Sequence, residues 1–262
     1  MGLYKTSGIV IKQVNYGEAD KILTILTRKY GKIQAIAKGA RKTKNRFLAC
    51  TQLFCYSDFI YYQGRNMAHI NQCELRESFF KLRMNLEKLT YSSYVIELIN
   101  AATQENEKEE KLFLLLIHTL NYLANNSQID ADLIVLTFQI KLMALTGYAP
   151  HLTDCVSCGK ELQGNFRMSN KLGGLICPNC MKMDPYAMTI TKEGQEILFF
   201  GLHQPLSKLA QLQKSKNTIQ QLQRIMNHYV STYLEKTFNS LDFLNTINSR
   251  EYIPKKGDDI SG

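Results

Sequence analysis

Apolar and polar residues alternate with a period of two in short runs over the first 80 positions. The first candidate strand begins with the alternating residues Ile9 and Ile11. The other four cover residues 22–26, 33–37, 53–62 and 67–75. Glycine-containing turn signals separate several of these runs. Alternation of this kind is typical of half-buried β-strands. Five short strands in residues 1–80 predict a small β-barrel of the OB-fold type, with a small open sheet as the alternative.

After Phe79 the apolar period lengthens to that of a helix. Residues 112–123 and 133–145 are apolar on nearly every side, which predicts at least one buried helix. Residues 105–110 are charge-rich and are interpreted as a solvated loop or first helical turn. Thr191 is a candidate helix cap. An amphipathic stripe follows at Ile219, Leu222, Ile225, Met226, Tyr229, Val230 and Tyr233. We therefore expect a helical domain over residues 81–150 and 186–250, and a flexible tail at 251–262.

Two C-x-x-C pairs interrupt the helical pattern. The four cysteines are Cys155, Cys158, Cys177 and Cys180, with eighteen residues between the pairs. This spacing matches a structural zinc site in which two short knuckles complete a tetrahedron. Residues 151–185 are thus predicted to form a zinc-ribbon-like insert. Four thiolates leave no open position for water, so the zinc would be structural and not catalytic.

Alternatives to a zinc site are four unmetallated thiols or a redox pair. Neither pair lies in a βαβ pattern, which disfavours the redox interpretation. His151 would be surplus to a complete tetrahedron and is interpreted as a surface or packing histidine. Cys50, Cys55 and Cys73 show no ligand spacing and fit small buried residues in apparent strands.

Positive charge is concentrated at the N-terminal end. The chain carries a net charge of +9, and residues 1–80 hold 13 Lys/Arg against 5 Asp/Glu. Within this part, KGARKTKNRF at residues 38–47 contains five cations and no acid. The cations are Lys38, Arg41, Lys42, Lys44 and Arg46. Extended, such a segment could cover up to roughly 30 Å, which favours a phosphate backbone over a small anion.

Two interpretations of this basic segment remain. It could contact phosphates, with nearby aromatic rings stacking on unpaired bases. Alternatively, it is a solvated loop whose lysines confer solubility. Each aromatic residue taken singly is better interpreted as core. Five contacts with single-strand phosphates would give a log–log salt slope of about −3.5.

We find no pattern typical of catalysis or of a membrane protein. Phosphate-loop, dinucleotide, zinc-protease, serine-hydrolase and deaminase motifs are missing from the sequence. The longest apolar run, residues 112–117, is shorter than a membrane span, and we see no secretory signal. We expect a soluble α+β protein that binds and is not an enzyme.

Five motifs in this order resemble the RecO family of bacterial recombination mediators over nearly the whole chain. They are TSGIVI (6–11), GEADKI (17–22), AKGARK (37–42), LTGYAP (145–150) before CVSCG (155–159), and YL (233–234) through SLDFL (240–244). The resemblance implies a cytoplasmic, nucleoid-associated DNA-repair protein that binds single- and double-stranded DNA and anneals complementary strands. It also implies that the protein, with RecR, helps RecA replace the single-stranded DNA-binding protein SSB.

The resemblance also implies site residues and a partner contact. The acidic, Phe-ending tail of SSB would meet the helical domain, where Lys141 stands at a position that is arginine in many members. Lys5 and Arg65 are further candidates for DNA contact beside the five cations of residues 38–47. Two other functional classes stay open. One is an RNA-modifying enzyme with a basic barrel, and the other is a zinc-ribbon assembly factor that binds only protein.

Overall fold

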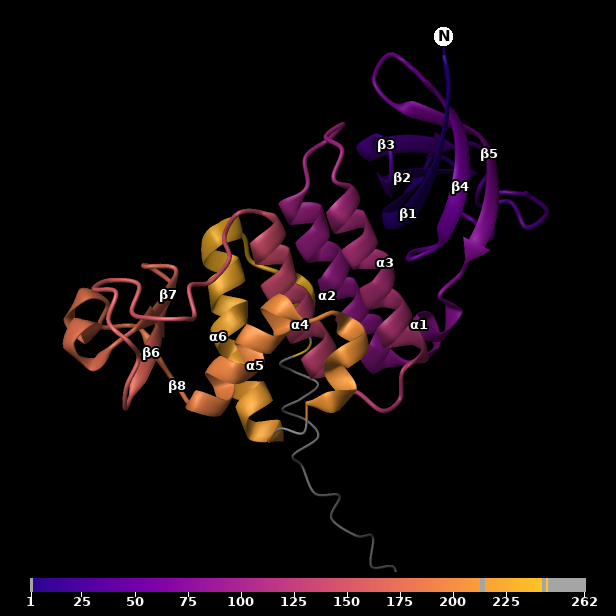
Figure 1. The fold of residues 1–262 in the computed structure, drawn as a ribbon. Helices are drawn as coiled ribbons and strands as arrows, with labels where there is room; N and C mark the ends of the chain where they lie inside the picture. Colours follow the sequence, from indigo (N-terminus) through magenta and orange to yellow (C-terminus); the bar gives the residue numbers. More distant parts are fainter. Residues whose placement is uncertain (1, 213–214, 242–243, 245–262) are drawn as a thin grey trace, which may run out of the picture.

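The computed structural model describes residues 2–212, 215–241 and 244, and has three parts (Figure 1). A β-barrel lies at one end of a helical domain, and a small three-stranded lobe lies at the other end. The tail predicted at residues 251–262 lies outside the described residues. No helix in the described part of the chain combines the length and apolar composition needed to cross a membrane.

Five strands close into the predicted barrel. They are β1 (Leu3–Tyr16), β2 (Asp20–Thr27), β3 (Gly31–Ala37), β4 (Tyr56–Gln63) and β5 (Ala68–Glu77). Around the barrel their order is β1-β2-β3-β5-β4, and β1 pairs with both β2 and β4. A register shift between Val10 and Lys12 lets this long strand bend as it passes from one partner to the other. The barrel is therefore closed, and the open-sheet alternative is wrong.

The fourth strand begins later than the apolar pattern predicted. Residues 53–55 form a turn, and β4 starts at Tyr56. Phe54 has a left-handed backbone with φ 71°, and its N–H donates to the carbonyl oxygen of Val10 at 3.0 Å. Its ring is fully buried in the core shared by the barrel and the helices. Burial of one aromatic ring thus takes precedence over β-strand alternation here.

Six labelled α-helices build the central domain within the described residues. They are α1 (Phe80–Met84), α2 (Leu86–Ala102), α3 (Glu110–Asn125), α4 (Ala131–Leu145), α5 (Lys192–His203) and α6 (Lys216–Leu234). Helix α4 packs against α2, α3, α5 and α6, and every residue from 133 to 140 is buried. This confirms the buried helix expected from its apolar composition. Thr191 caps α5 by accepting a hydrogen bond from the N–H of Gly194 at 3.1 Å.

The barrel and the helices share one hydrophobic core. Ile9, Ile11 and Leu26 from the barrel belong to the same buried cluster as the helical residues, whereas a second cluster fills the barrel interior. The Lys32 ammonium group donates to the carbonyl oxygens of Asn100 and Thr103 at 2.8 and 2.6 Å. These acceptors lie at the C-terminal end of α2, where carbonyl groups lack helical partners. The junction is therefore both apolar and hydrogen-bonded.

Residues 104–109, which we call the junction loop, contact the barrel directly. Glu105 forms a parallel bridge with Lys32, and the N–H of Asn106 donates to the Lys32 carbonyl oxygen at 3.0 Å. Gly31 has φ 69°, and a Cβ atom there would lie 2.0 Å from the carbonyl oxygen of Glu107. Glu110 pairs with Arg28 at 2.8 Å. The charged segment thus adds backbone contacts to the edge of β3 and is more than a solvated loop.

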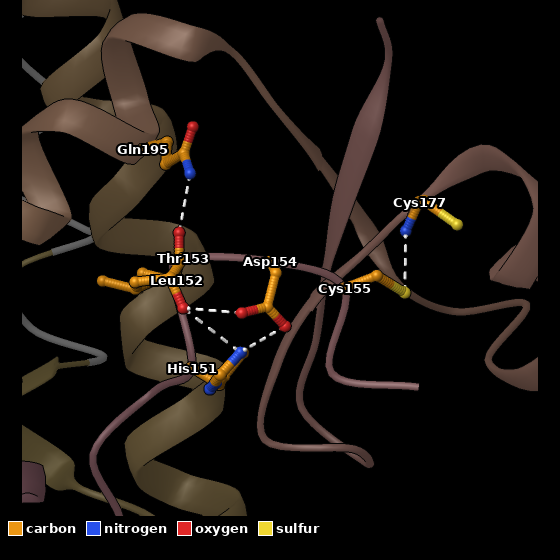
Figure 2. Close-up of polar contacts among 7 residues, drawn as sticks. All are labelled: His151, Leu152, Thr153, Asp154, Cys155, Cys177 and Gln195. Carbon is orange, nitrogen blue, oxygen red and sulfur yellow. Dashed lines mark hydrogen bonds and ion pairs between the residues drawn. The ribbon is translucent and has the colours of Figure 1, made fainter. Parts of the chain in front are cut away.

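Residues 151–190 form the small lobe, which we call the metal lobe. Its sheet has the order β7-β6-β8, from β6 (Phe166–Ser169), β7 (Gly174–Ile176) and β8 (Met188–Ile190). A short 3₁₀ helix, η1 (Pro178–Met183), carries the second cysteine pair, and η2 (Leu206–Gln211) follows α5. The sheet extends beyond residue 185, where we placed the end of the insert. Leu152 anchors the lobe, because its carbonyl oxygen accepts from the buried Gln195 side chain of α5 at 2.6 Å (Figure 2).

Candidate nucleic-acid interface and metal centre

Residues 38–47, the basic loop, fold into consecutive turns between β3 and β4. The N–H groups of Lys42 and Asn45 donate to the carbonyl oxygens of Gly39 and Lys42 at 2.9 and 3.0 Å. Phe47 ends the loop and is buried in the barrel interior. The loop is therefore compact, and the extended form considered from the sequence is not present. Its side chains, and not the length of its backbone, determine how far its charges reach.

Three hydrogen bonds fix the loop to the β1–β2 hairpin. The N–H of Gly39 donates to Oδ1 of Asp20 at 2.7 Å, and the N–H of Arg41 donates to the carbonyl oxygen of Ala19 at 2.9 Å. The Arg41 guanidinium group also donates to the carbonyl oxygen of Gly17 at 3.0 Å. Sequence reasoning missed Asp20, because nothing in local spacing relates it to a loop that begins after the next strand.

All five loop cations are exposed. None of them forms an ion pair within the described part of the chain. Arg46 lies over the Phe47 ring, 5.0 Å from its centroid, and donates to the carbonyl oxygen of Asn71 at 2.7 Å. Because these groups are exposed and form no ion pair among the described residues, their positive charge is available to an anion.

Lys5 shares a groove with one loop cation. This groove, of about 410 Å³, is lined by Lys5, Arg46, Asp58, Ile60, Gln72, Cys73 and Glu74. Asp58 is paired with Arg76 at 2.6 Å, which reduces its competition for the groove cations. Arg65 is exposed in the turn between β4 and β5 and does not line the groove. The structure therefore brings Lys5 to Arg46, whereas Arg65 belongs to another segment of the barrel surface.

Four barrel aromatics are core residues, as expected for each taken singly, whereas Tyr4 and Tyr16 are 37% and 53% exposed. Phe47, Phe54, Phe59 and Tyr61 are at most 6% exposed. Tyr62 is half-buried and stacks on His69, with ring centroids 4.9 Å apart and planes inclined by 8°. Four of these rings thus offer no free face to a nucleotide base.

The four cysteines of the metal lobe converge as their spacing predicts. The Sγ atoms of Cys155, Cys158, Cys177 and Cys180 all lie within 4.8 Å of one another. Gly159 follows the first pair with φ 68°, a conformation that glycine adopts without strain, and its N–H donates to the Cys155 carbonyl oxygen at 2.8 Å. Four soft sulfur ligands at this separation could hold one metal ion.

Backbone hydrogen bonds favour the thiolate form of Cys155. Burial by itself raises the pKa of this thiol, but N–H groups of Cys177, Cys158 and Ser157 outweigh burial and lower the pKa to about 6. The contact from the Cys177 N–H to Cys155 Sγ is 3.3 Å long (Figure 2). The lobe therefore stabilises negative charge on a ligand atom, as a metal-binding knuckle requires.

His151 takes no part in the cysteine cluster. Its Nε2 atom lies 2.9 Å from Oδ1 of Asp154, and Thr153 donates to Oδ2 of the same carboxylate at 3.0 Å. Figure 2 shows this exposed trio apart from Cys155 and Cys177. The interpretation of His151 as a surface residue is confirmed.

Comparison with known proteins agrees with this architecture. A family described as Recombination protein O N terminal matches residues 1–79, and Recombination protein O C terminal matches residues 83–242. DNA repair protein RecO of Alkaliphilus metalliredigens is 38% identical over 246 residues, covering 94% of this chain and 100% of that protein. Its counterpart in Acetivibrio thermocellus is 36% identical over 248 residues, covering 95% and 98%. Taken together, the barrel, the helical domain and these matches show that the chain belongs to the RecO family of DNA repair proteins.

Proposed function

We propose that this protein binds single- and double-stranded DNA, anneals complementary strands and, with RecR, promotes the loading of RecA onto single-stranded DNA coated by SSB. The observation that carries the proposal is the basic loop, whose five exposed cations form no ion pair within the described residues. A cationic strip screens the repulsion between two phosphate backbones, so two strands approach one another without nucleotide hydrolysis. The protein would act in the cytoplasm, at the nucleoid, and would make or break no covalent bond.

The metal centre has a supporting role in this proposal. We assign Zn²⁺ to the four cysteines, because an all-thiolate tetrahedral site is typical of structural zinc. When bound, zinc would brace the three-stranded lobe, whose buried residues Phe166, Met168 and Leu175 belong to the same cluster as the helical core. Cys155 is buried and its thiolate form is favoured, so it would be the first of the four cysteines to bind the ion. DNA contact is assigned to the barrel at the other end of the molecule.

Lys141 is proposed to contact the acidic, Phe-ending tail of SSB. Its Nζ atom lies 3.4 Å from the carbonyl oxygen of Leu202 on α5, and burial lowers the pKa of this lysine. Helix α5 also carries Phe199 and Phe200, which line a pocket of about 450 Å³. A cation on α4 and a pocket with two phenylalanine rings on the neighbouring α5 suit a peptide that ends in an aromatic residue and a carboxylate. Lys141→Glu should abolish binding of such a peptide, whereas Lys111→Glu, at an exposed position of α3, should not.

One experiment tests the central proposal. Two labelled complementary oligonucleotides, one of them coated with SSB, are mixed without nucleotide triphosphate, with and without the protein. We expect faster annealing, and we expect the triple variant Lys42→Gln, Lys44→Gln, Arg46→Gln to lose both acceleration and DNA binding. The matched control neutralises three exposed lysines outside the barrel, Lys111, Lys160 and Lys208. No acceleration by the wild type at low salt would contradict the proposal.

The salt dependence of binding gives a second measure. If all five loop cations contact single-strand phosphates, the affinity falls about a hundredfold between 50 and 200 mM salt. The triple variant should have a slope smaller by roughly two units, because three contacts are gone. An unchanged slope in that variant would place the DNA contact on another part of the protein.

A further inference from the structure

A cavity of about 720 Å³, which we call the lobe cavity, lies between the metal lobe and α6. It is lined by the turn after β6 (residues 170–171), by residues 184–188 before and at the start of β8, and by Arg224, His228 and Thr232 of α6. Figure 1 shows α6 next to the lobe. The volume lies within the range of about 300–1,000 Å³ that small-molecule sites occupy. Because three separate segments build the cavity, no motif marks it in the sequence.

Hydrogen bonds hold the lobe side of the cavity in place. The Asp184 carboxylate is 6% exposed, and it accepts from the Ser169 hydroxyl group at 2.6 Å and from the N–H of Tyr186 at 3.0 Å. The Tyr233 hydroxyl group of α6 donates to the carbonyl oxygen of Asn170 at 2.9 Å, which ties the turn to the helix. Asp184 therefore uses both of its oxygens within the lobe, and the cavity is formed before any ligand enters.

One buried amide oxygen in the cavity wall lacks a donor. Asn170 is 8% exposed, and its Nδ2 atom contacts Nδ1 of His228 on α6. Its Oδ1 atom is buried and has no hydrogen-bond partner among the described residues. A buried oxygen in this condition is costly, and native structures seldom contain one without an explanation. Since Asn170 lines the cavity, an N–H group of a ligand would supply the missing donor.

Positive charge predominates at the rim of the lobe cavity. Lys171 and Arg224 are exposed, and neither forms an ion pair within the described part of the chain. Asp184 is the one acidic residue of the lining, and its oxygens already accept hydrogen bonds from the lobe. A guanidinium group can hold two oxygens of a phosphate at once. The rim therefore suits an anionic ligand, and a phosphate in particular.

Tyr186 gives the cavity an aromatic wall. This residue is 92% exposed, and Met188 adds apolar surface to the same lining. None of the aromatic ring pairs among the described residues includes Tyr186. A free tyrosine ring stacks well on a nucleobase, because every base has a flat π face. The barrel aromatics that are buried in the core have no comparable free face.

We propose that the lobe cavity binds a nucleotide. The phosphate lies at Arg224 and Lys171, the base stacks on Tyr186, and an N–H group of the base donates to Oδ1 of Asn170. A nucleotide combines the anion, the flat ring and the N–H donor that these three parts of the cavity require. The ligand is a free nucleoside phosphate or one unpaired nucleotide of a strand, since both carry the same groups. This site goes beyond the proposed function, which assigns DNA contact to the barrel.

Isothermal titration of the full-length, metal-loaded protein with adenosine monophosphate tests the proposal. The barrel variant Lys42→Gln, Lys44→Gln, Arg46→Gln is titrated beside the wild type, so that phosphate binding at the basic loop is removed. We expect one lobe site per chain in both proteins. Adenosine, which lacks the phosphate, and ribose 5-phosphate, which lacks the base, should each bind at least about tenfold more weakly. Failure of DNA binding at the barrel would leave these results unchanged.

Two substitutions at exposed positions locate the ligand. In the barrel variant, Arg224→Gln removes the guanidinium contact and Tyr186→Ala removes the stacked ring, so each should weaken binding of adenosine monophosphate roughly tenfold. Lys216→Gln on α6 and Lys182→Gln in the lobe are the matched controls, because both lysines are exposed and lie outside the lining. The controls should leave the affinity unchanged. Circular dichroism confirms that each variant is folded.

Competition in the barrel variant distinguishes the two sources of the nucleotide. Displacement of adenosine monophosphate by a single-stranded oligonucleotide identifies a strand nucleotide, whereas displacement by free nucleotides alone identifies a nucleoside phosphate. Two results would overturn the proposal. One is the absence of adenosine monophosphate binding at millimolar concentration, even if an acidic peptide binds at Arg224 in its place. The other is binding that both Arg224→Gln and Tyr186→Ala leave unchanged.

Discussion

Oδ1 of Asp20 accepts a hydrogen bond from the backbone N–H of Gly39 at 2.7 Å, and so links the start of β2 to the start of the basic loop. The neighbouring contact, from the Arg41 N–H to the Ala19 carbonyl oxygen, lies on the same hairpin. A carboxylate beside a cationic loop would be expected to weaken anion binding by its charge. Here it also positions the backbone that carries the cations, and the two effects have opposite signs.

Asp20→Ala separates these two effects. If positioning dominates, affinity for single-stranded DNA falls by roughly 10- to 150-fold, because a lost hydrogen bond to a charged acceptor is worth about 1.5–3 kcal/mol. If charge dominates, affinity rises. Fluorescence anisotropy with a labelled oligonucleotide measures the sign. Asp20→Asn keeps an acceptor oxygen and removes the charge, so it should bind DNA at least as tightly as the wild type, and weaker binding would contradict the positioning role.

Gly31→Ala should destabilise the barrel more than Gly17→Ala. Both glycines have positive φ, 69° and 56°, so alanine costs about 1–2 kcal/mol at either position. Only at Gly31 would the added Cβ meet backbone, 2.0 Å from the Glu107 carbonyl oxygen, whereas nothing lies within 4 Å at Gly17. The overlap should add roughly 1–3 kcal/mol. Urea unfolding of the two variants measures the difference. Equal losses of unfolding free energy would show that the junction loop moves to accommodate the added Cβ atom without further cost.

Lys32→Met should weaken the junction between the barrel and α2. The substitution leaves the Asn100 and Thr103 carbonyl oxygens without the ammonium donor, at a cost of about 1–3 kcal/mol in unfolding free energy. Lys29→Met is the matched control, because Lys29 is exposed and should change stability by less than about 0.5 kcal/mol. Chemical denaturation of both variants provides the comparison. Equal stability of the two would show that water replaces the lost contacts.

Removing the proposed zinc ion should unfold the metal lobe and spare the barrel. A strong chelator, or Cys158→Ser, should abolish binding of one zinc ion per chain and remove a stabilisation on the order of 10 kcal/mol from the lobe. Cys73→Ser, a cysteine outside the cluster, should retain the metal. Zinc analysis and limited proteolysis measure these effects. DNA binding that disappears together with zinc would contradict the assignment of DNA contact to the barrel.

The metal centre should also depend on pH in one direction. The pKa of Cys155 in the folded metal-free lobe is about 6, well below its usual value of 9.0. A depressed pKa stabilises the fold fully above pH 9, and this contribution is lost as the pH falls from 9 towards 6. Thiolates are also the metal-binding form, so zinc should be released as the pH falls below about 6. Zinc content after equilibration across pH 5–8 checks the expected sign.

The sequence predicted those features that local spacing encodes. Alternation over residues 1–80 indicated five strands, and the two C-x-x-C pairs indicated a cluster that the structure brings within 4.8 Å. It failed where long-range contacts decide local structure. Phe54 leaves the strand pattern to fill the shared core, and the junction loop pairs with β3. Such pairings have no spacing rule, because their partners are separated by whole strands.

Because the barrel and the helices share one core, the two matched regions of the chain are not independent folding units. Residues 1–79 and 83–242 match two separate family descriptions, yet Ile9, Ile11 and Leu26 lie with the helical residues in one buried cluster. Cutting the chain between these two regions would expose apolar surface on both fragments. Each half expressed alone should aggregate. The two halves produced together should associate and restore a single cooperative melting transition.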